Sequence, residues 1–255
     1  MTNNDFGAVL LFSMIIMGLS GFVRAVEPPK AKKIPYTLEK HGDVRVDDYY
    51  WLRERTDAKV LKYLKDENLY TAAMLKPVEK LQAKLFAEMK SRIKEDDSSV
   101  PFKYGDYYYY KRYEKGFEYP IYARKQGSVE AKEEIILNVN EVAKGTSFCQ
   151  VRFPAIRPDH KMIAYAVDTK GRRFFTIYFK DLHTGKLYAE KLTDTAGNMA
   201  WANDNKTLFY VKQDTGTLRW NRVLRHELGF RKNPEVYFEA DETFELNISK
   251  SNTDK

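Results

Sequence analysis

Cysteine is nearly absent from this sequence. Its 255 residues include one, Cys149, which cannot form an intramolecular disulfide and supplies no thiolate cluster for zinc. Glycine and proline are sparse, at 13 and 9 residues, which excludes a collagen-like chain and a long low-complexity tail. With 43% hydrophobic and 31% charged residues, the composition is that of a globular protein rather than a polytopic membrane protein.

Common catalytic motifs are missing as well. No G-x-S-x-G nucleophile elbow occurs, and the leader segment Gly18–Gly21 has a different spacing. Neither a G-x-x-x-x-G-K-[ST] loop nor a G-x-G-x-x-G loop is present, so no nucleotide site is indicated. The four histidines are far apart, without an H-x-x-x-H pair. We therefore assign no catalytic, cofactor-binding or metal-binding residue and expect no cofactor.

The remaining chemically active side chains have simpler interpretations. His160, His183 and His226 lie within turn signals, and we expect them to be solvated turn residues rather than ligands. Cys149 lies at the start of an expected strand with no histidine nearby, which predicts a small buried hydrophobic residue rather than a nucleophile. The acidic run at 95–97 could hold a cation, but its spacing does not match a loop of alternating ligands.

Charge and aromatic content point to a sheet protein rather than a nucleic-acid binder. The 43 basic and 36 acidic residues give a net charge of +7, spread along the chain and interleaved with acids. The 18 Tyr, 15 Phe and 3 Trp make 14% of the chain, and tyrosine and phenylalanine favour strands.

The first 25 residues resemble an export signal. Sixteen uncharged, mostly apolar positions run from Ala8 to Val23, fewer than the roughly 20 that a spanning helix needs. Small residues flank Arg24 before Val26, where a signal peptidase would cut, although Asp5 and the lack of a basic residue before the run are atypical. We expect a signal peptide over 1–25 and an exported protein, periplasmic or secreted; an uncleaved anchor and a buried core segment are the alternatives.

Residues 26–98 are predicted to form an extended arm followed by a helical segment. The stretch EPPKAKKIP at 27–35 is rich in proline and lysine and favours an extended, solvated arm. Asp57 can cap a first helix, and Pro77 is placed to begin a second. The second helix carries an apolar stripe that we expect to be buried: Val78, Leu81, Leu85, Met89 and Ile93.

From residue 99 onward the pattern changes to strands and turns. The tyrosine run at 107–110 is followed by a turn at 114–116 and a second strand at 119–124. A tyrosine ladder can be a ligand platform, but sheet packing is the favoured interpretation here.

An internal repeat of about 45 residues lies in this part of the chain. Asp159 and Asp204, each in a polar turn before a strand, are 45 residues apart, and so are Tyr165 and Tyr210. A unit of this length with several short strands has the size of one propeller blade. A hairpin at 104–137 and units at about 150–195 and 196–240 give about three blades, whereas closed propellers need about four to eight. The sequence thus predicts an incomplete propeller with open strand edges.

Several segments, in this order and spacing, resemble the N-terminal half of the oligopeptidase B group within the prolyl oligopeptidase family of serine peptidases. They are 47–53 (DDYYWLR), 60–64 (VLKYL), 67–71, 99–101 (SVP), 107–110, 118–122 (EYPIY), the strings around Asp159 and Asp204, 226–229 (HELG) and 241–244 (DETF).

This resemblance implies a seven-bladed propeller that caps an α/β-hydrolase domain and admits only short peptides. The implied activity is cleavage after Lys or Arg by Ser, Asp and His of the hydrolase domain, which this sequence does not contain. No catalytic residue of the family can be placed on any position, so we expect the chain alone to be inactive. We expect a mainly β protein with a signal peptide at 1–25, an arm and helical segment at 26–98 and a partial propeller at 99–255.

Two functional interpretations remain at this stage. The favoured one is the substrate-gating part of a truncated or split serine oligopeptidase, with peptides as substrates and a separately encoded C-terminal half as a conceivable partner. The alternative is a stand-alone, non-enzymatic binding module of propeller type. Neither interpretation involves nucleic acid or, after signal cleavage, an integral membrane span.

Overall fold

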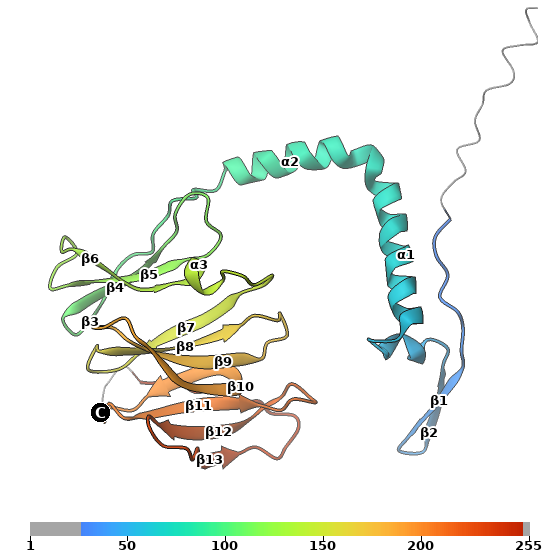
Figure 1. Cartoon of the computed structure of the whole chain (residues 1–255). Coiled ribbons are helices and arrows are strands. Elements are labelled where there is room, and N and C mark those ends of the chain that lie inside the picture. Colours follow the sequence, from blue (N-terminus) through green and yellow to red (C-terminus); the bar gives the residue numbers. More distant parts are fainter. Residues whose placement is uncertain (1–26, 252–255) are drawn as a thin grey trace, which may run out of the picture. The chain divides into compact units, whose positions relative to one another are not determined.

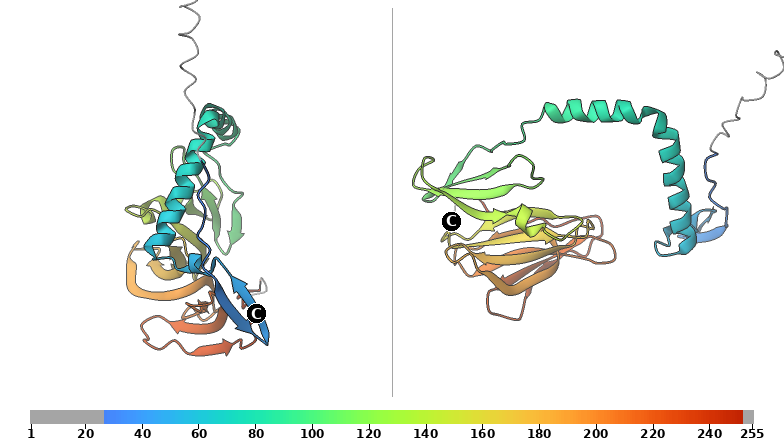
Figure 2. Two further views of the ribbon diagram at one scale, coloured as in Figure 1. Left: turned by 90° about the vertical axis from the view of Figure 1, so that its right-hand side faces the viewer. Right: turned by 45° about the horizontal axis from the view of Figure 1, so that its top comes forward.

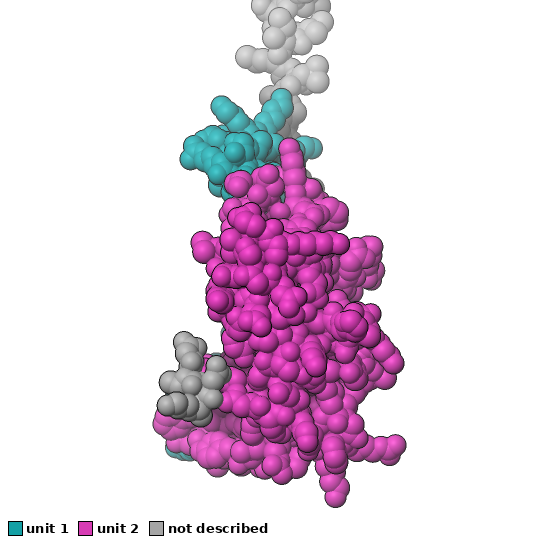
Figure 3. Space-filling view, turned by 90° about the vertical axis from the view of Figure 1, so that its left-hand side faces the viewer, with its two compact units in different colours: residues 1–93 teal, residues 94–255 magenta. Residues whose placement is uncertain are grey.

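The computed structural model describes residues 27–251, which divide into two compact units between Ile93 and Lys94. The two units are coloured separately in Figure 3 and are described separately here. The predicted signal peptide at 1–25 lies outside the described residues.

The first unit is a hairpin followed by helices. Strands β1 and β2 pair antiparallel around a two-residue turn, His41-Gly42, whose φ angles of 56° and 78° suit a type I′ hairpin. Asp57 caps α1 as predicted, because its carboxylate accepts a hydrogen bond of 2.7 Å from the amide of Lys59. The elements are β1 (Tyr36–Lys40), β2 (Asp43–Asp47), a 3-10 turn (Tyr50–Arg53), α1 (Ala58–Leu75), a 3-10 turn (Lys76–Val78) and α2 (Glu79–Ser91).

The apolar stripe of α2 is not buried, which contradicts the expectation of a core-facing helix. Its five residues are 39–67% exposed, and Val60 is the buried residue of α1. Among the described residues, no helix is both long and apolar enough to cross a membrane.

The second unit contains a four-stranded antiparallel sheet, β3 to β6, and a seven-stranded antiparallel sheet, β7 to β13 (Figure 1). The long strand β10 pairs with β9 through its first half and with β11 through its second half, so we divide the seven-stranded sheet there and describe three four-stranded sheets, called units A, B and C. Unit A contains β3 (Phe102–Tyr104), β4 (Tyr107–Arg112), β5 (Ile121–Gln126) and β6 (Glu133–Asn138), followed by the short helix α3 (Val139–Val142). Unit B contains β7 (Gln150–Ile156), β8 (Met162–Asp168), β9 (Phe175–Asp181) and the first half of β10 (Leu187–Trp201). Unit C contains the second half of β10, β11 (Thr207–Gln213), β12 (Trp220–Glu227) and β13 (Glu235–Phe238).

The views in Figures 1 and 2 show these sheets following one another face to face. Strand β8 holds the three sheets together, because its successive side chains point alternately into two hydrophobic cores. Met162, Ala164 and Ala166 join the core shared with unit C, and the intervening residues join the core shared with unit A. All seven residues of β8 are buried, as expected of a continuous apolar strand covered on both faces.

The 45-residue repeat is reproduced in the turns that precede β8 and β11. His160 and Asn205 occupy equivalent positions, both with φ 59° in the left-handed region. The preceding aspartate binds backbone amides in each turn: Asp159 Oδ1 accepts from Lys161, and Asp204 Oδ1 accepts from Lys206. The amide of Asp159 also donates to Asn205 Oδ1 at 2.9 Å, so the turn of unit C reaches back to that of unit B.

Within residues 27–251, β13 pairs on one side only, with β12, and is therefore an edge strand of unit C. All four residues of β13 are exposed, including two aromatic side chains. Taken together, the hairpin and helices of the first unit and the antiparallel sheets of the second confirm the mainly β architecture with a preceding helical segment that the sequence predicts.

Candidate functional site

The first strands of the three sheets line a common hollow of about 580 Å³. Residues 102–104 of β3, 154–156 of β7 and 199–201 of β10 form its walls, and Lys250 and Ser251 complete it. The lining is largely apolar and aromatic, and it includes no histidine, cysteine or carboxylate. The hollow therefore offers contact surface, and none of its lining side chains is an ordinary general acid or base.

A second, apolar hollow of about 370 Å³ lies between units A and B. Tyr109, Tyr110 and Tyr122 of unit A face Pro154 and Ile156 of unit B across it. Tyr109 and Tyr110 are 3% and 9% exposed, so these members of the tyrosine run pack within the sheets, as expected, rather than form an open platform.

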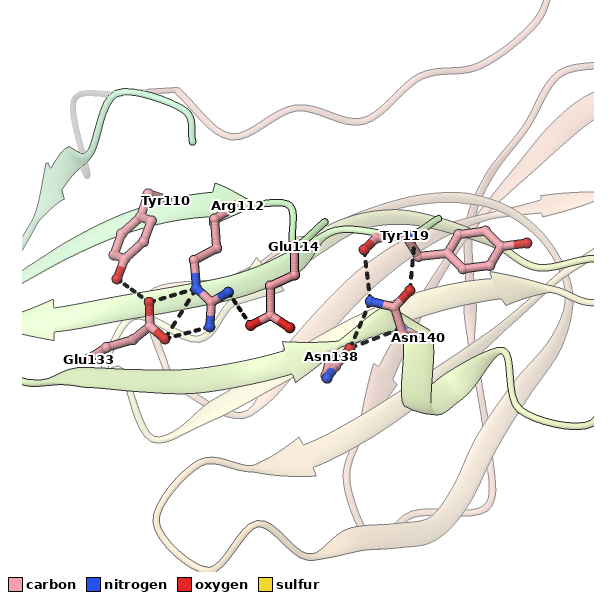
Figure 4. A network of polar contacts seen from close by, with 7 residues as sticks. All are labelled: Tyr110, Arg112, Glu114, Tyr119, Glu133, Asn138 and Asn140. Carbon is pink, nitrogen blue, oxygen red and sulfur yellow. Dashed lines mark hydrogen bonds and ion pairs between the residues drawn. The ribbon is translucent and has the colours of Figure 1, made fainter. Parts of the chain in front are cut away.

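A polar network joins the strands of unit A (Figure 4). The Arg112 guanidinium binds both oxygens of Glu133, at 2.8 and 2.9 Å, and also donates to Glu114. The hydroxyl of Tyr110 donates to the same Glu133 carboxylate. This pairing with Arg112 holds the pKa of Glu133 below its ordinary value. This bidentate ion pair links β4 to the start of β6 across the intervening strand β5.

The amide of Asn140 at the start of α3 forms a second part of this network (Figure 4). It accepts from the backbone amide of Tyr119 at 3.0 Å and donates to the Tyr119 carbonyl at 2.8 Å. Asn138 caps α3 by accepting from the amide of Asn140. These contacts replace backbone pairing where β5 begins, so they stabilise the fold.

His160 is half-buried between units A and B, which contradicts the expectation of a solvated turn residue. Its ring packs against Tyr104, Tyr107 and Tyr109, with centroids 4.7–6.0 Å away. Nδ1 shares a hydrogen bond of 2.8 Å with the hydroxyl of Tyr109. Arg124, 4% exposed, donates to the carbonyl oxygen of His160 at 2.5 Å.

His226 is also misplaced by the sequence interpretation, because it lies within β12 and is 1% exposed. Its Nδ1 donates to Asn233 Oδ1 at 2.7 Å, and its Nε2 lies 3.3 Å from Glu190 of unit B. The eight residues of β12, WNRVLRHE, do not alternate between apolar and polar, so the sequence carries no local signal that His226 faces inward. The third turn histidine, His183, is exposed as expected.

Cys149 is 5% exposed, which confirms the prediction of a small buried residue. Burial, with a smaller effect of the Asp168 charge, raises the pKa of its thiol, so a reactive thiolate is disfavoured. In the acidic run, the Asp97 carboxylate lies 3.8 Å from Nζ of Lys94. The backbone carbonyl of Asp97 accepts a hydrogen bond from the amide of Tyr113. Within residues 27–251, no group of three or more His, Cys, Asp or Glu side chains is arranged to hold a metal.

The half-buried ring of His160 contacts tyrosine rings, and the buried ring of His226 contacts Phe179, Asn233 and Glu190. None of these partners is the serine or cysteine of an acyl-transfer site.

Comparison with known proteins agrees with this architecture. Residues 28–255 match the family described as "Prolyl oligopeptidase, N-terminal beta-propeller domain". The chain is 36% identical over 271 residues to dipeptidyl aminopeptidase BI of Pseudoxanthomonas mexicana, covering 97% of this chain and 38% of that protein. It is 36% identical over 236 residues to Protease 2 of Moraxella lacunata, covering 89% and 34%.

Among solved structures, oligopeptidase B from Leishmania major superposes with a TM-score of 0.79 and 36% identity, covering 86% of this chain and 34% of that one. Oligopeptidase B from Trypanosoma brucei, in the closed form with covalently bound antipain, gives a TM-score of 0.77 and 29% identity, covering 84% and 33%. The chain thus spans between 33% and 38% of the length of these relatives.

Proposed function

The chain belongs to the prolyl oligopeptidase family through its N-terminal β-propeller domain, and from this premise we propose that it forms the substrate-gating part of an oligopeptidase B-like serine endopeptidase. The proposed enzyme cleaves short peptides after Lys or Arg. The observation that carries the proposal is the family match over residues 28–255, which takes in all three sheets of the second unit.

The gating role is supported by the hollow that the first strands of units A, B and C share. Phe102 of β3, 61% exposed, presents aromatic surface to it, and Tyr104 of β3 and the largely buried Trp201 of β10 also line it. A wall of this kind contacts an extended peptide without reacting with it, whereas a folded protein is too large for a space of about 580 Å³.

The bond-breaking groups of the proposed enzyme belong to an α/β-hydrolase domain outside these 255 residues. A serine nucleophile needs a histidine base within hydrogen-bond reach and an acid that orients it. His160 and His226 are engaged in packing between the sheets instead. The 255-residue chain is accordingly expected to show no peptidase activity by itself.

The test is a peptidase assay of the purified chain, with and without the protein encoded immediately downstream. Three fluorogenic amides separate the possible activities: an N-terminally blocked peptide ending in Arg, a dipeptide ending in Arg with a free amino terminus, and a blocked peptide ending in Pro. The matched control is the downstream protein alone.

Turnover of the blocked Arg substrate by the mixture, and by neither protein alone, is the expected result. Turnover by this chain alone would overturn the assignment of the catalytic groups to another domain. Preference for the free dipeptide or for the Pro substrate would overturn the proposed specificity. No turnover with any substrate in the mixture would contradict the gating role and favour a stand-alone binding module.

The proposal includes export of the protein and a peptide-binding role without nucleic acid or an integral membrane span. The hydrophobic leader at 8–23 supports export. Cell fractionation combined with N-terminal sequencing tests it: a mature protein that begins at Val26 outside the cytoplasm is expected, and a cytoplasmic protein that retains Met1 would contradict it.

A further inference from the structure

His160 joins units A and B by packing its ring, whereas Asn205, the equivalent residue of unit C, joins units B and C by a hydrogen bond. The turn before β8 places the imidazole against the turn between β3 and β4, so closely that a Cβ added to Gly105 would overlap Nε2 of His160. In the next repeat, the side-chain oxygen of Asn205 reaches the turn of unit B and accepts a hydrogen bond from the backbone amide of Asp159. The same backbone position thus links neighbouring sheets twice, once with a titratable side chain and once with a neutral one.

The surroundings of His160 disfavour a positive charge. Three tyrosine rings of unit A enclose the imidazole, and the Arg124 guanidinium is stacked 4.1 Å from the centroid of Tyr107, one of these rings. Arg124 is itself held by Glu134, through two hydrogen bonds of 2.8 Å, and by the carbonyl oxygen of His160. A second cation at the ring would therefore lie in a half-buried site beside a guanidinium that cannot move away without losing these bonds.

The charged and titratable groups around the ring come from every element packed against it. From unit A they are Tyr104 of β3, Asp106 of the β3–β4 turn, Tyr107 and Tyr109 of β4, Arg124 of β5 and Glu134 of β6. From unit B they are Asp159 and Lys161, in the same turn as His160, and Asp181 and His183, which line the adjoining hollow. Burial and the Arg124 charge lower the pKa of His160 below 6.5, and the charges of Asp159 and Asp106 oppose this only in part.

We propose that His160 is an acid-sensitive latch between units A and B, which holds the two sheets together when the imidazole is neutral and loosens them when it is protonated. This device goes beyond the proposed peptidase role and does not depend on it. A histidine whose pKa is lower in the closed state binds a proton more readily when the interface opens. The closed interface is therefore fully stable above pH 6.5 and is weakened as the pH falls from 6.5 to the lower pKa of the closed state.

Two measurements on the full chain test the latch. The first is an NMR titration of the four histidine side chains, in which the His160 signal is identified by its loss in the variant His160→Asn. The second is amide hydrogen exchange of β4 and β8, followed from pH 7.5 to pH 5 and corrected for the intrinsic pH dependence of exchange. Asparagine is the matched replacement because Asn205 adopts the same φ of 59° at the equivalent position.

We expect His160 to titrate below 6.5 and the opening of β4 and β8 to increase with acid by about tenfold for each unit of that shift. In His160→Asn this increase should be absent, whereas the control His183→Asn, at an exposed turn, should retain it. Exchange of β11 in unit C should not follow the same pH dependence. A His160 pKa at or above 6.5, or equal acid sensitivity of His160→Asn and the wild type, would overturn the proposal. If His160→Asn does not fold, the pH dependence of hydrogen exchange in His183→Asn decides the test. Loss of the acid-induced opening of β4 and β8 in that variant would refute the proposal, because it would assign the opening to His183.

Discussion

Replacing Gly197 with alanine tests how strand β10 passes from unit B to unit C. Gly197 lies at the irregularity where β10 changes its pairing partner, with φ 82°. A Cβ there would lie 2.7 Å from Cδ of Arg152 and 3.2 Å from Cγ of Phe175. Neither neighbour can yield easily, because Phe175 is fully buried and Arg152 is bound to the Ala196 carbonyl at 3.0 Å.

The expected loss of stability has two components. A positive φ costs a non-glycine residue about 1–2 kcal/mol, and forcing an extra methyl group into a packed site costs about 1–3 kcal/mol. Gly197→Ala should therefore lower the free energy of unfolding by about 2–5 kcal/mol. Gly145→Ala is the matched control, because Gly145 has φ 78° but no atom within 4 Å of its added Cβ. This control should lose only about 1–2 kcal/mol.

Urea denaturation followed by tryptophan fluorescence measures the difference. Trp51 lies in the other unit and is replaced by phenylalanine in every variant, so that emission reports Trp201 and Trp220. With a slope of about 2–3 kcal/mol per molar urea, Gly197→Ala should lower the midpoint by about 1–2 M and Gly145→Ala by about half a molar. Equal midpoints for the two variants would refute the close approach of β10 to β7 and β9.

Three further predictions concern other parts of the second unit. Leu208→Ala should lower the free energy of unfolding by about 2–5 kcal/mol, because Leu208 is fully buried between units B and C, whereas Leu187→Ala, at a 49% exposed site, should change it little; equal urea midpoints would contradict this. Cys149 should react with a thiol reagent such as DTNB slowly in the native protein and quickly in urea, and fast native labelling would contradict its burial. Arg112 lowers the pKa of Glu133, so the ion pair stabilises the folded protein above pH 4.5, the ordinary pKa of a glutamate, and this stabilisation is lost as the pH falls further. Glu133→Gln should therefore lower the free energy of unfolding at pH 7 and make it less dependent on pH in acid. An unchanged dependence of stability on pH would exclude such a contribution.

Much of the fold follows from local patterns. Asp57 caps α1 because a short carboxylate before a helix can accept from its first amides. The strand expected after the polar turn at Asp159 forms as β8, and all of its residues from 162 to 167 are buried. The turns at Asp159 and Asp204 repeat because each aspartate binds the backbone of its own turn.

Contacts between segments that are distant in the sequence do not follow from local patterns. His160 was assigned to solvent because it lies in a polar turn, yet a different sheet, with Tyr104, Tyr107 and Tyr109, covers its ring. His226 was treated likewise, although its strand position turns it towards Glu190 of unit B. The α2 stripe was expected to be buried because it is apolar, but periodicity shows only that a helix has such a face and not what covers it.

The sequence by itself thus determined the elements whose cause is local: the capped helix, the strands that follow the polar turns, and the repeated aspartate turns. The tertiary structure alone decided which side chains of successive repeats meet. Glycine at 105 leaves room for the imidazole of His160, whereas Asn205 reaches back to the preceding turn, where it accepts a hydrogen bond from the amide of Asp159. The physical reason is that burial and charge environment depend on residues tens of positions away, and no local pattern encodes which of them will face a given side chain.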